Sequence, residues 1–202
     1  MTNAPIRTLT FGAISWTDPR LVEALYPEDA PPEWWLSCYA SHFDTVLVPE
    51  SDWQGAVAST WLETLPSQFW FYLRVETVPD AATLAQLLDL GAKLGDRLGG
   101  FVIEPTAAGC EAALADGLPG APVFSTTAGA GMQRLWTGED CPCPCGAVGR
   151  VHFEGRPSPR QLRTALEGFL ACQDEAWGVL FLDAPAESFE QARVIGQLLG
   201  VS

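Results

Sequence analysis

Short apolar runs alternate with helix-like runs along almost the whole chain, and this alternation restricts the fold more than any other feature. The strand-like runs are residues 7–15, 44–49, 69–75, 99–104, 121–126, 148–154 and 179–183. They lack the polar residue at every second position that is typical of a sheet with one wet face, so they predict a parallel sheet buried on both faces. Repeated strand–helix units build either a barrel or a doubly wound sheet.

The intervening segments have the three- and four-residue apolar spacing of amphipathic helices. We expect helices in 33–43, 53–65, 79–94, 158–170 and 188–199, with a shorter one in 109–116. No Gly-x-Gly-x-x-Gly and no phosphate-binding P-loop follows a strand, so the nucleotide-binding form of a doubly wound sheet lacks its signature. The sequence therefore predicts a shortened TIM-barrel-like α/β fold of about seven mostly parallel strands.

The chain length suits one such domain over residues 1–202, since a barrel of this kind needs roughly 200 residues. An irregular segment is expected at 127–147, where glycines and a Cys-Pro-Cys-Pro-Cys run interrupt any regular spacing.

Composition narrows the possible partners. The chain is 48% hydrophobic and only 18% charged, which excludes intrinsic disorder. Eleven Lys and Arg against 25 Asp and Glu give a net charge of −14, which repels nucleic-acid backbones and anionic membrane surfaces. No apolar run approaches the roughly 18 residues that cross a bilayer, and no secretory signal is visible. We expect a cytoplasmic protein that binds neither nucleic acid nor membrane, with its six cysteines reduced.

A series of short motifs gives a family resemblance. In order, the motifs are Gly12-Ala-Ile-Ser-Trp16, Tyr26-Pro27, Trp35-Leu36, Tyr39-Ala40, Phe43, Thr45-Val46, Trp61, Pro66, Phe69, Phe71, Leu94-Gly95, Leu98-Gly99, Arg150-Val-His152 and Gln191-Ala192. Their order and spacing resemble the YecE-like family (domain of unknown function 72). The resemblance implies a TIM-barrel-like fold and carries no established biochemical activity.

The chain departs from this family pattern at several strand ends. The run 46–49 reads Val-Leu-Val-Pro where the family has Val-Glu-x-Asn, and Arg74 stands where the third strand usually has Lys. The Thr-His that follows in the family is missing around Val78, and Glu104-Pro105 lacks a second proline. Residues 105–147 look too short for the middle of the family, so a barrel strand is expected to be missing or replaced by irregular chain.

Functional side chains of parallel barrels lie where the strands end. The predicted ligand-binding residues are Trp16, Trp70, Arg74, Glu104, Arg150 and Asp183. The predicted catalytic residues are His152, as general acid–base, and Glu154, on the same strand face. Arg74 and Arg150 are the predicted anion clamp, because guanidinium groups match carboxylate and phosphate geometry. The structural alternative is that these arginines pair with Glu104 or Asp183 and hold no ligand.

Metal and cofactor sites have weaker support. His152 and the acidic strand ends are suitable ligand types for a hard divalent ion, but they show no ligand spacing, so neither metal nor cofactor is assigned. Cys141, Cys143 and Cys145 offer only three local thiols where structural zinc takes four ligands, and we interpret them as incidental thiols of a surface loop.

Three functional hypotheses remain. The first is a non-catalytic or weakly active binding protein for a small anionic ligand or a protein partner. The alternative is an enzyme acting on a phosphorylated or carboxylated small molecule, with Arg74 and Arg150 as the clamp and His152 moving a proton. The third is a structural subunit whose incomplete barrel is completed by a partner chain.

Overall fold

The computed structural model describes residues 8–201 except 64, 128–131, 139–140, 142–143 and 174. Its strands form one eight-stranded sheet in the order β6-β5-β4-β3-β2-β1-β8-β7, and every neighbouring pair is parallel. The strands are β1 (Thr8–Ile14), β2 (Thr45–Val48), β3 (Trp70–Val75), β4 (Leu98–Ile103), β5 (Val123–Ser125), β6 (Gln133–Arg134), β7 (Val148–His152) and β8 (Trp177–Asp183).

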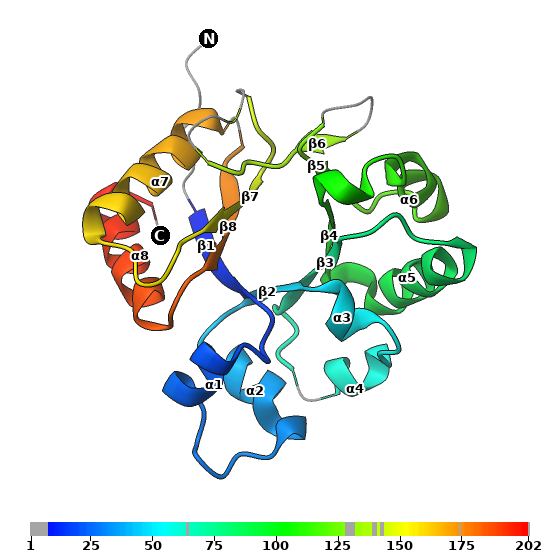
Figure 1. Cartoon of the computed structure of the whole chain (residues 1–202), viewed down its shortest axis with the longest axis horizontal. Coiled ribbons are helices and arrows are strands. Elements are labelled where there is room, and N and C mark those ends of the chain that lie inside the picture. The colour runs from blue at the N-terminus through cyan, green and yellow to red at the C-terminus, as the bar shows by residue number, and fades with distance from the viewer. Residues whose placement is uncertain are drawn as a thin grey trace.

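The helices lie around the outside of this ring of strands (Figure 1). They are α1 (Pro19–Leu25), α2 (Trp35–Ala40), α3 (Glu50–Trp53), α4 (Ala58–Leu62), α5 (Ala81–Leu94), α6 (Glu111–Gly117), α7 (Pro159–Cys172) and α8 (Glu187–Leu198), with short 3₁₀ turns at Pro32–Trp34, Gly95–Arg97 and Pro105–Ala107. The predicted TIM-barrel-like α/β fold is confirmed. None of these helices has both the length and the apolar character to cross a bilayer.

The two edges of the sheet meet just after β6. The Trp136 amide donates to the Val148 carbonyl at 3.1 Å, and the Arg150 amide donates to the Trp136 carbonyl at 2.8 Å. These bonds form a parallel bridge between Trp136 and Gly149, which joins the β6 edge to β7. The barrel therefore closes within one chain, and no partner strand is needed to complete it.

The sequence predicted about seven strands, and the part of the chain that the structure describes has eight. The missed strand, β6, lies inside the segment expected to be irregular. It consists of Gln133 and Arg134 alone, so it has no apolar run to reveal it. The expected loss of a barrel strand is not found, because the short strand β6 and the backbone bonds of the next two residues complete a ring of eight described strands.

Two layers of apolar side chains hold the barrel. The inner layer consists of strand residues and Leu135, with Tyr72, Phe124 and Phe181 as its largest members. The outer layer joins the other strand face to the helices. Gly12 makes room for the inner layer, because a Cβ there would lie 2.7 Å from the Phe181 ring and 2.8 Å from the Thr45 carbonyl oxygen.

One predicted helix is divided. The segment 53–65 was expected to be a single helix, but only α4 lies within it: α3 ends at Trp53, and a turn separates the two helices. Gly55 has a φ of 77° in that turn, a conformation that ends a helix. Within this segment Val57 is exposed, whereas Trp61 is buried.

Candidate functional site

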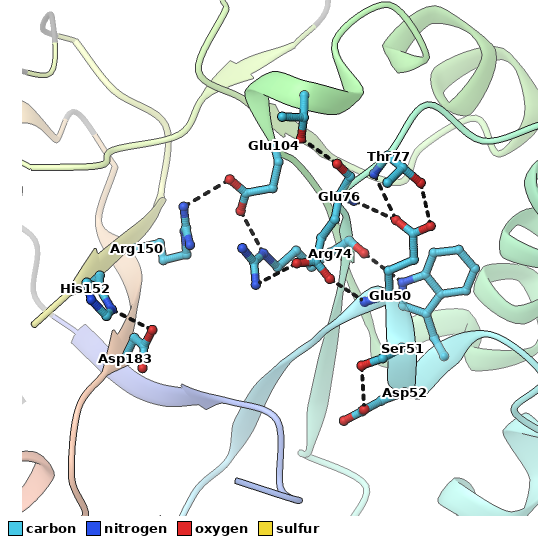
Figure 2. Close-up of polar contacts among 12 residues, drawn as sticks. Glu50, Ser51, Asp52, Arg74, Glu76, Thr77, Glu104, Arg150, His152 and Asp183 are labelled. Atoms are coloured by element: carbon cyan, nitrogen blue, oxygen red, sulfur yellow. Dashed lines mark hydrogen bonds and ion pairs between the residues drawn. The ribbon is translucent and has the colours of Figure 1, made fainter. Parts of the chain in front are cut away.

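A charged cluster lies across the mouth formed by the carboxyl ends of the strands (Figure 2). Arg74 is on β3, Arg150 is on β7, and Glu104 directly follows β4. Arg74 Nε donates to Glu104 Oε1 at 2.7 Å, and Arg150 Nη2 donates to Glu104 Oε2 at 3.0 Å. Because β3 and β7 lie on opposite sides of the eight-membered ring, this one carboxylate links the two sides of the mouth.

This cluster is largely shielded from solvent. The side chains of Glu104, Arg74 and Arg150 are 9%, 18% and 21% exposed. Burial lowers the pKa of the Arg150 guanidinium; Glu104 opposes this effect, and the Arg74 charge adds to it. Within the described part of the chain, Arg150 Nε is a buried donor without a hydrogen-bond partner. The pairing proposed as the structural alternative is therefore present, but it leaves at least one guanidinium donor unused.

Two further glutamates surround Arg74. Arg74 Nη1 lies 3.1 Å from Glu76 Oε1. The Glu50 carboxylate accepts hydrogen bonds from the backbone amides of Glu76 and Thr77 at 2.8 and 3.0 Å. The Trp53 indole donates to the Arg74 carbonyl at 2.7 Å. Residues that follow β2 thus fix the end of β3, and with it the position of the Arg74 side chain.

His152 belongs to a second polar group at the same mouth. Its Nδ1 lies 2.7 Å from Asp183 Oδ2, and Arg20 Nη2 lies 2.6 Å from the other oxygen of that carboxylate. Burial, the largest influence, raises the pKa of Asp183, but the hydrogen bonds from Arg20 and His152 outweigh it and hold this pKa below its usual value. The His152 side chain is 59% exposed, so more than half of its surface is in contact with solvent.

A third polar group at the strand ends was not predicted from the sequence. Ser15, at the end of β1, has a φ of 63°, which is uncommon for a residue with a side chain. Its hydroxyl is hydrogen-bonded to Asp52 and accepts a bond from the Thr17 amide. At the end of β5, Ser125 is similarly bonded to Glu111 at 3.2 Å. Ser15 and Ser125 could have been identified by their positions at strand ends, but the predicted site residues were charged or aromatic ones.

Three predicted residues do not join the cluster. Trp16 is buried in the outer layer, with its ring 5.2 Å from that of Trp61. Trp70 begins β3 and lies at the opposite end of the barrel from Arg74, where its ring is 6.4 Å from Trp177 and lines a separate cavity of about 280 Å³. Glu154 is exposed beyond β7, and no hydrogen bond or ion pair within the described residues involves it. These three residues do not take part in the cluster around Glu104, and their roles in binding or catalysis stay predictions.

The cysteine predictions also need correction. Cys145 is buried, so it is not an incidental thiol of a surface loop. Cys172 is disulfide-bonded, so the expectation of six reduced cysteines was wrong. Cys143 lies outside the described residues.

The closed ring of parallel strands with charged strand ends defines a TIM-barrel-like α/β protein. The chain belongs to the DUF72 family, described as a protein of unknown function, whose model matches residues 10–112. The predicted membership of this family is confirmed. A crystal structure of a DUF72 family protein from Enterococcus faecalis V583 has the same fold, with 13% identity, a TM-score of 0.59 and 100% of both chains covered. No curated protein gives a significant match.

Proposed function

We propose that this protein binds a small anionic molecule at the carboxyl-end mouth of the barrel, between Arg74 and Arg150, without catalysing a reaction on it. The observation that carries the proposal is the position of Glu104, whose single carboxylate receives guanidinium groups from opposite sides of the mouth. Glu104 occupies the place that the carboxylate or phosphate of a ligand takes between two such groups.

The donor count leaves room for a ligand. A guanidinium has five N–H donors, and Glu104 accepts one from each arginine. Glu76 lies within ion-pair distance of a second nitrogen of Arg74, and the buried Nε of Arg150 has no partner among the described residues. A ligand oxygen can therefore bind beside Glu104 or replace its carboxylate.

The local charge favours binding over catalysis. Two arginines and the two glutamates paired with them sum to zero (2 − 2 = 0), so an incoming anion meets no excess of positive charge. Strong stabilisation of a developing negative charge needs preorganised donors that are not already neutralised. This balance supports modest, reversible binding.

Isothermal titration with inorganic phosphate and with citrate tests the proposal. Glu104→Gln removes the resident carboxylate, and we expect it to tighten anion binding about tenfold or more, because a negative charge close to the ligand is lost. Arg150→Met is expected to abolish binding. Arg163→Met is the matched control, since Arg163 pairs with Glu167 on the exposed face of α7. Failure of both the wild-type chain and Glu104→Gln to bind either anion refutes the proposal.

The contact between His152 and Asp183 favours one alternative function. A carboxylate on Nδ1 orients an imidazole and leaves Nε2 for proton transfer, as general acid–base chemistry requires. The alternative is an enzyme acting on a phosphorylated or carboxylated small molecule. Phosphate release from a panel of sugar phosphates tests the phosphate branch, with His152→Gln expected to reduce the rate about 100-fold. No release by the wild-type chain removes that branch.

A further inference from the structure

A small cavity lies at the amino end of the barrel, opposite the charged mouth. It has a volume of about 280 Å³ and is formed at the starts of four neighbouring strands, β3, β2, β1 and β8. In the sheet register Trp70 is paired with Thr45, and Trp177 is paired with Thr8. The cavity therefore has a tryptophan on each outer strand of this group and threonines on the two strands between them.

The two tryptophans are the large apolar side chains of this cavity, and both are open to solvent. Trp70 is 43% exposed and Trp177 is 38% exposed. Each precedes by two residues a member of the inner layer, Tyr72 or Val179, so both lie on the inner strand face. Their rings are 6.4 Å apart at an interplanar angle of 87°, which makes a corner of two aromatic rings. Exposed apolar side chains that are grouped in this way, and not scattered singly, mark binding sites.

A buried hydroxyl in the cavity lacks a partner. Thr45 lines the cavity and is 2% exposed, yet its Oγ1 has no hydrogen-bond partner among the described residues. Thr45 is on the inner face of β2, because Leu47, two residues further on, belongs to the inner layer. A buried polar atom without a partner costs free energy, so a ligand that supplies the missing hydrogen bond is favoured there.

The charge around the cavity selects a cation. Asp44 is exposed and is the one charged residue among the described residues that line the cavity, and its carboxylate forms no ion pair within that part of the chain. Arg193 lines an adjoining cavity, but its guanidinium donates to the His42 carbonyl at 2.6 Å and lies 5.3 Å from the centre of the Phe43 ring. The net charge of −14 also attracts cations to the protein.

We propose that this cavity binds a small organic ammonium ion that also has a hydroxyl group. The ammonium group lies in the corner of Trp70 and Trp177, where the aromatic rings attract it and Asp44 supplies the opposite charge. The hydroxyl group of the ligand pairs with Thr45 Oγ1. The cavity volume is near the lower limit for ligand pockets, so it suits a ligand of few heavy atoms. This site is separate from the anion site proposed at the charged mouth, and neither proposal depends on the other.

Isothermal titration of the full chain with choline tests the charge requirement. The matched control ligand is the neutral alcohol in which a tert-butyl group replaces the trimethylammonium group, because it keeps the shape and the hydroxyl and loses only the charge. We expect choline to bind and the neutral alcohol to bind at least about tenfold more weakly, since its interactions with the rings and with Asp44 are lost. Tetramethylammonium lacks the hydroxyl and is expected to bind about fivefold more weakly than choline.

Variants locate the site on the chain. Trp177→Leu and Asp44→Asn should each weaken choline binding at least about fivefold, and both changes are at exposed side chains. Trp34→Leu is the matched control, because Trp34 is 63% exposed and lies outside the cavity lining, so this variant should bind choline like the wild type. The proposal is overturned if the wild-type chain binds neither ammonium ion, or if it binds the neutral alcohol as tightly as choline. Wild-type affinity for choline in both Trp177→Leu and Asp44→Asn would also overturn it.

Discussion

Glu104→Gln is expected to destabilise the protein strongly, although it replaces only one oxygen by a nitrogen. Among the described residues, Glu104 is the only ion-pair partner of Arg150, whereas Arg74 also has Glu76. Removing one partner of a buried ion pair costs roughly 3–5 kcal/mol, because the other charge remains buried without compensation. The partial exposure of both arginines places the expected loss near the lower end, at about 3 kcal/mol.

Urea denaturation and calorimetry can measure this loss. For a chain of this size each kcal/mol lowers Tm by about 2–4 °C, so about 3 kcal/mol corresponds to a decrease of roughly 6–12 °C. Glu76→Gln is the matched control: its side chain is 33% exposed and Arg74 keeps Glu104, so the expected loss is below about 1 kcal/mol.

A double variant separates the charge effect from a packing effect. Glu104→Gln combined with Arg150→Met removes the unpaired guanidinium, and we expect it to recover at least half of the lost stability. If Glu104→Gln is as stable as the wild type, the free energy lost by burying the carboxylate equals the free energy gained from its two ion pairs. The interpretation of Glu104 as the anion that holds the mouth together would then be wrong.

Four further predictions concern the barrel and its pH response. Tyr39→Phe removes the hydroxyl that bonds to backbone groups at Ala13 and Thr45, 2.8 Å from each, and urea denaturation should show a loss of about 2–4 kcal/mol. Gly12→Ala overfills the inner layer and should cost about 1–3 kcal/mol in the same assay. Gly196 lies on α8, and a Cβ there would make only ordinary van der Waals contacts with Val201 and Phe11, so Gly196→Ala should leave the stability unchanged or raise it. Because the pKa of Asp183 is lowered in the folded protein, its carboxylate stabilises the fold at neutral pH and this contribution disappears as the pH falls through that lowered pKa. Unfolding of Asp183→Asn measured across pH should therefore show a deficit at neutral pH that narrows below about pH 4.

The fold could be predicted because the strand–helix alternation extends over most of the chain. The exception is β6, which consists of two polar residues. It is a strand because of its backbone hydrogen bonds to β5, and such bonds cannot be recognised from the pattern of side chains. The strand–helix alternation and the family resemblance together predicted the barrel, but they could not show that Trp136 closes it.

The site was predicted in part for a similar reason. Because parallel strands end at one mouth, the strand-end positions of Arg74, Glu104 and Arg150 indicated that these residues lie close together. Trp70 shares the strand face of Arg74 but begins the strand, and sharing a face does not place two residues at the same end. Cys145 contacts Cys172 through a backbone hydrogen bond because β7 and β8 are neighbouring strands. The distance between the two residues in the sequence gives no sign of this contact.

The most direct test of the proposed binding site is the NMR signal of the arginine Nε–H groups during titration with inorganic phosphate. We expect the Nε–H signals of Arg74 and Arg150 to shift as phosphate binds, and to shift at lower phosphate concentration in Glu104→Gln. The signal of Arg163 is expected not to change. Unchanged signals of Arg74 and Arg150 in both proteins at saturating phosphate would contradict the proposed binding site.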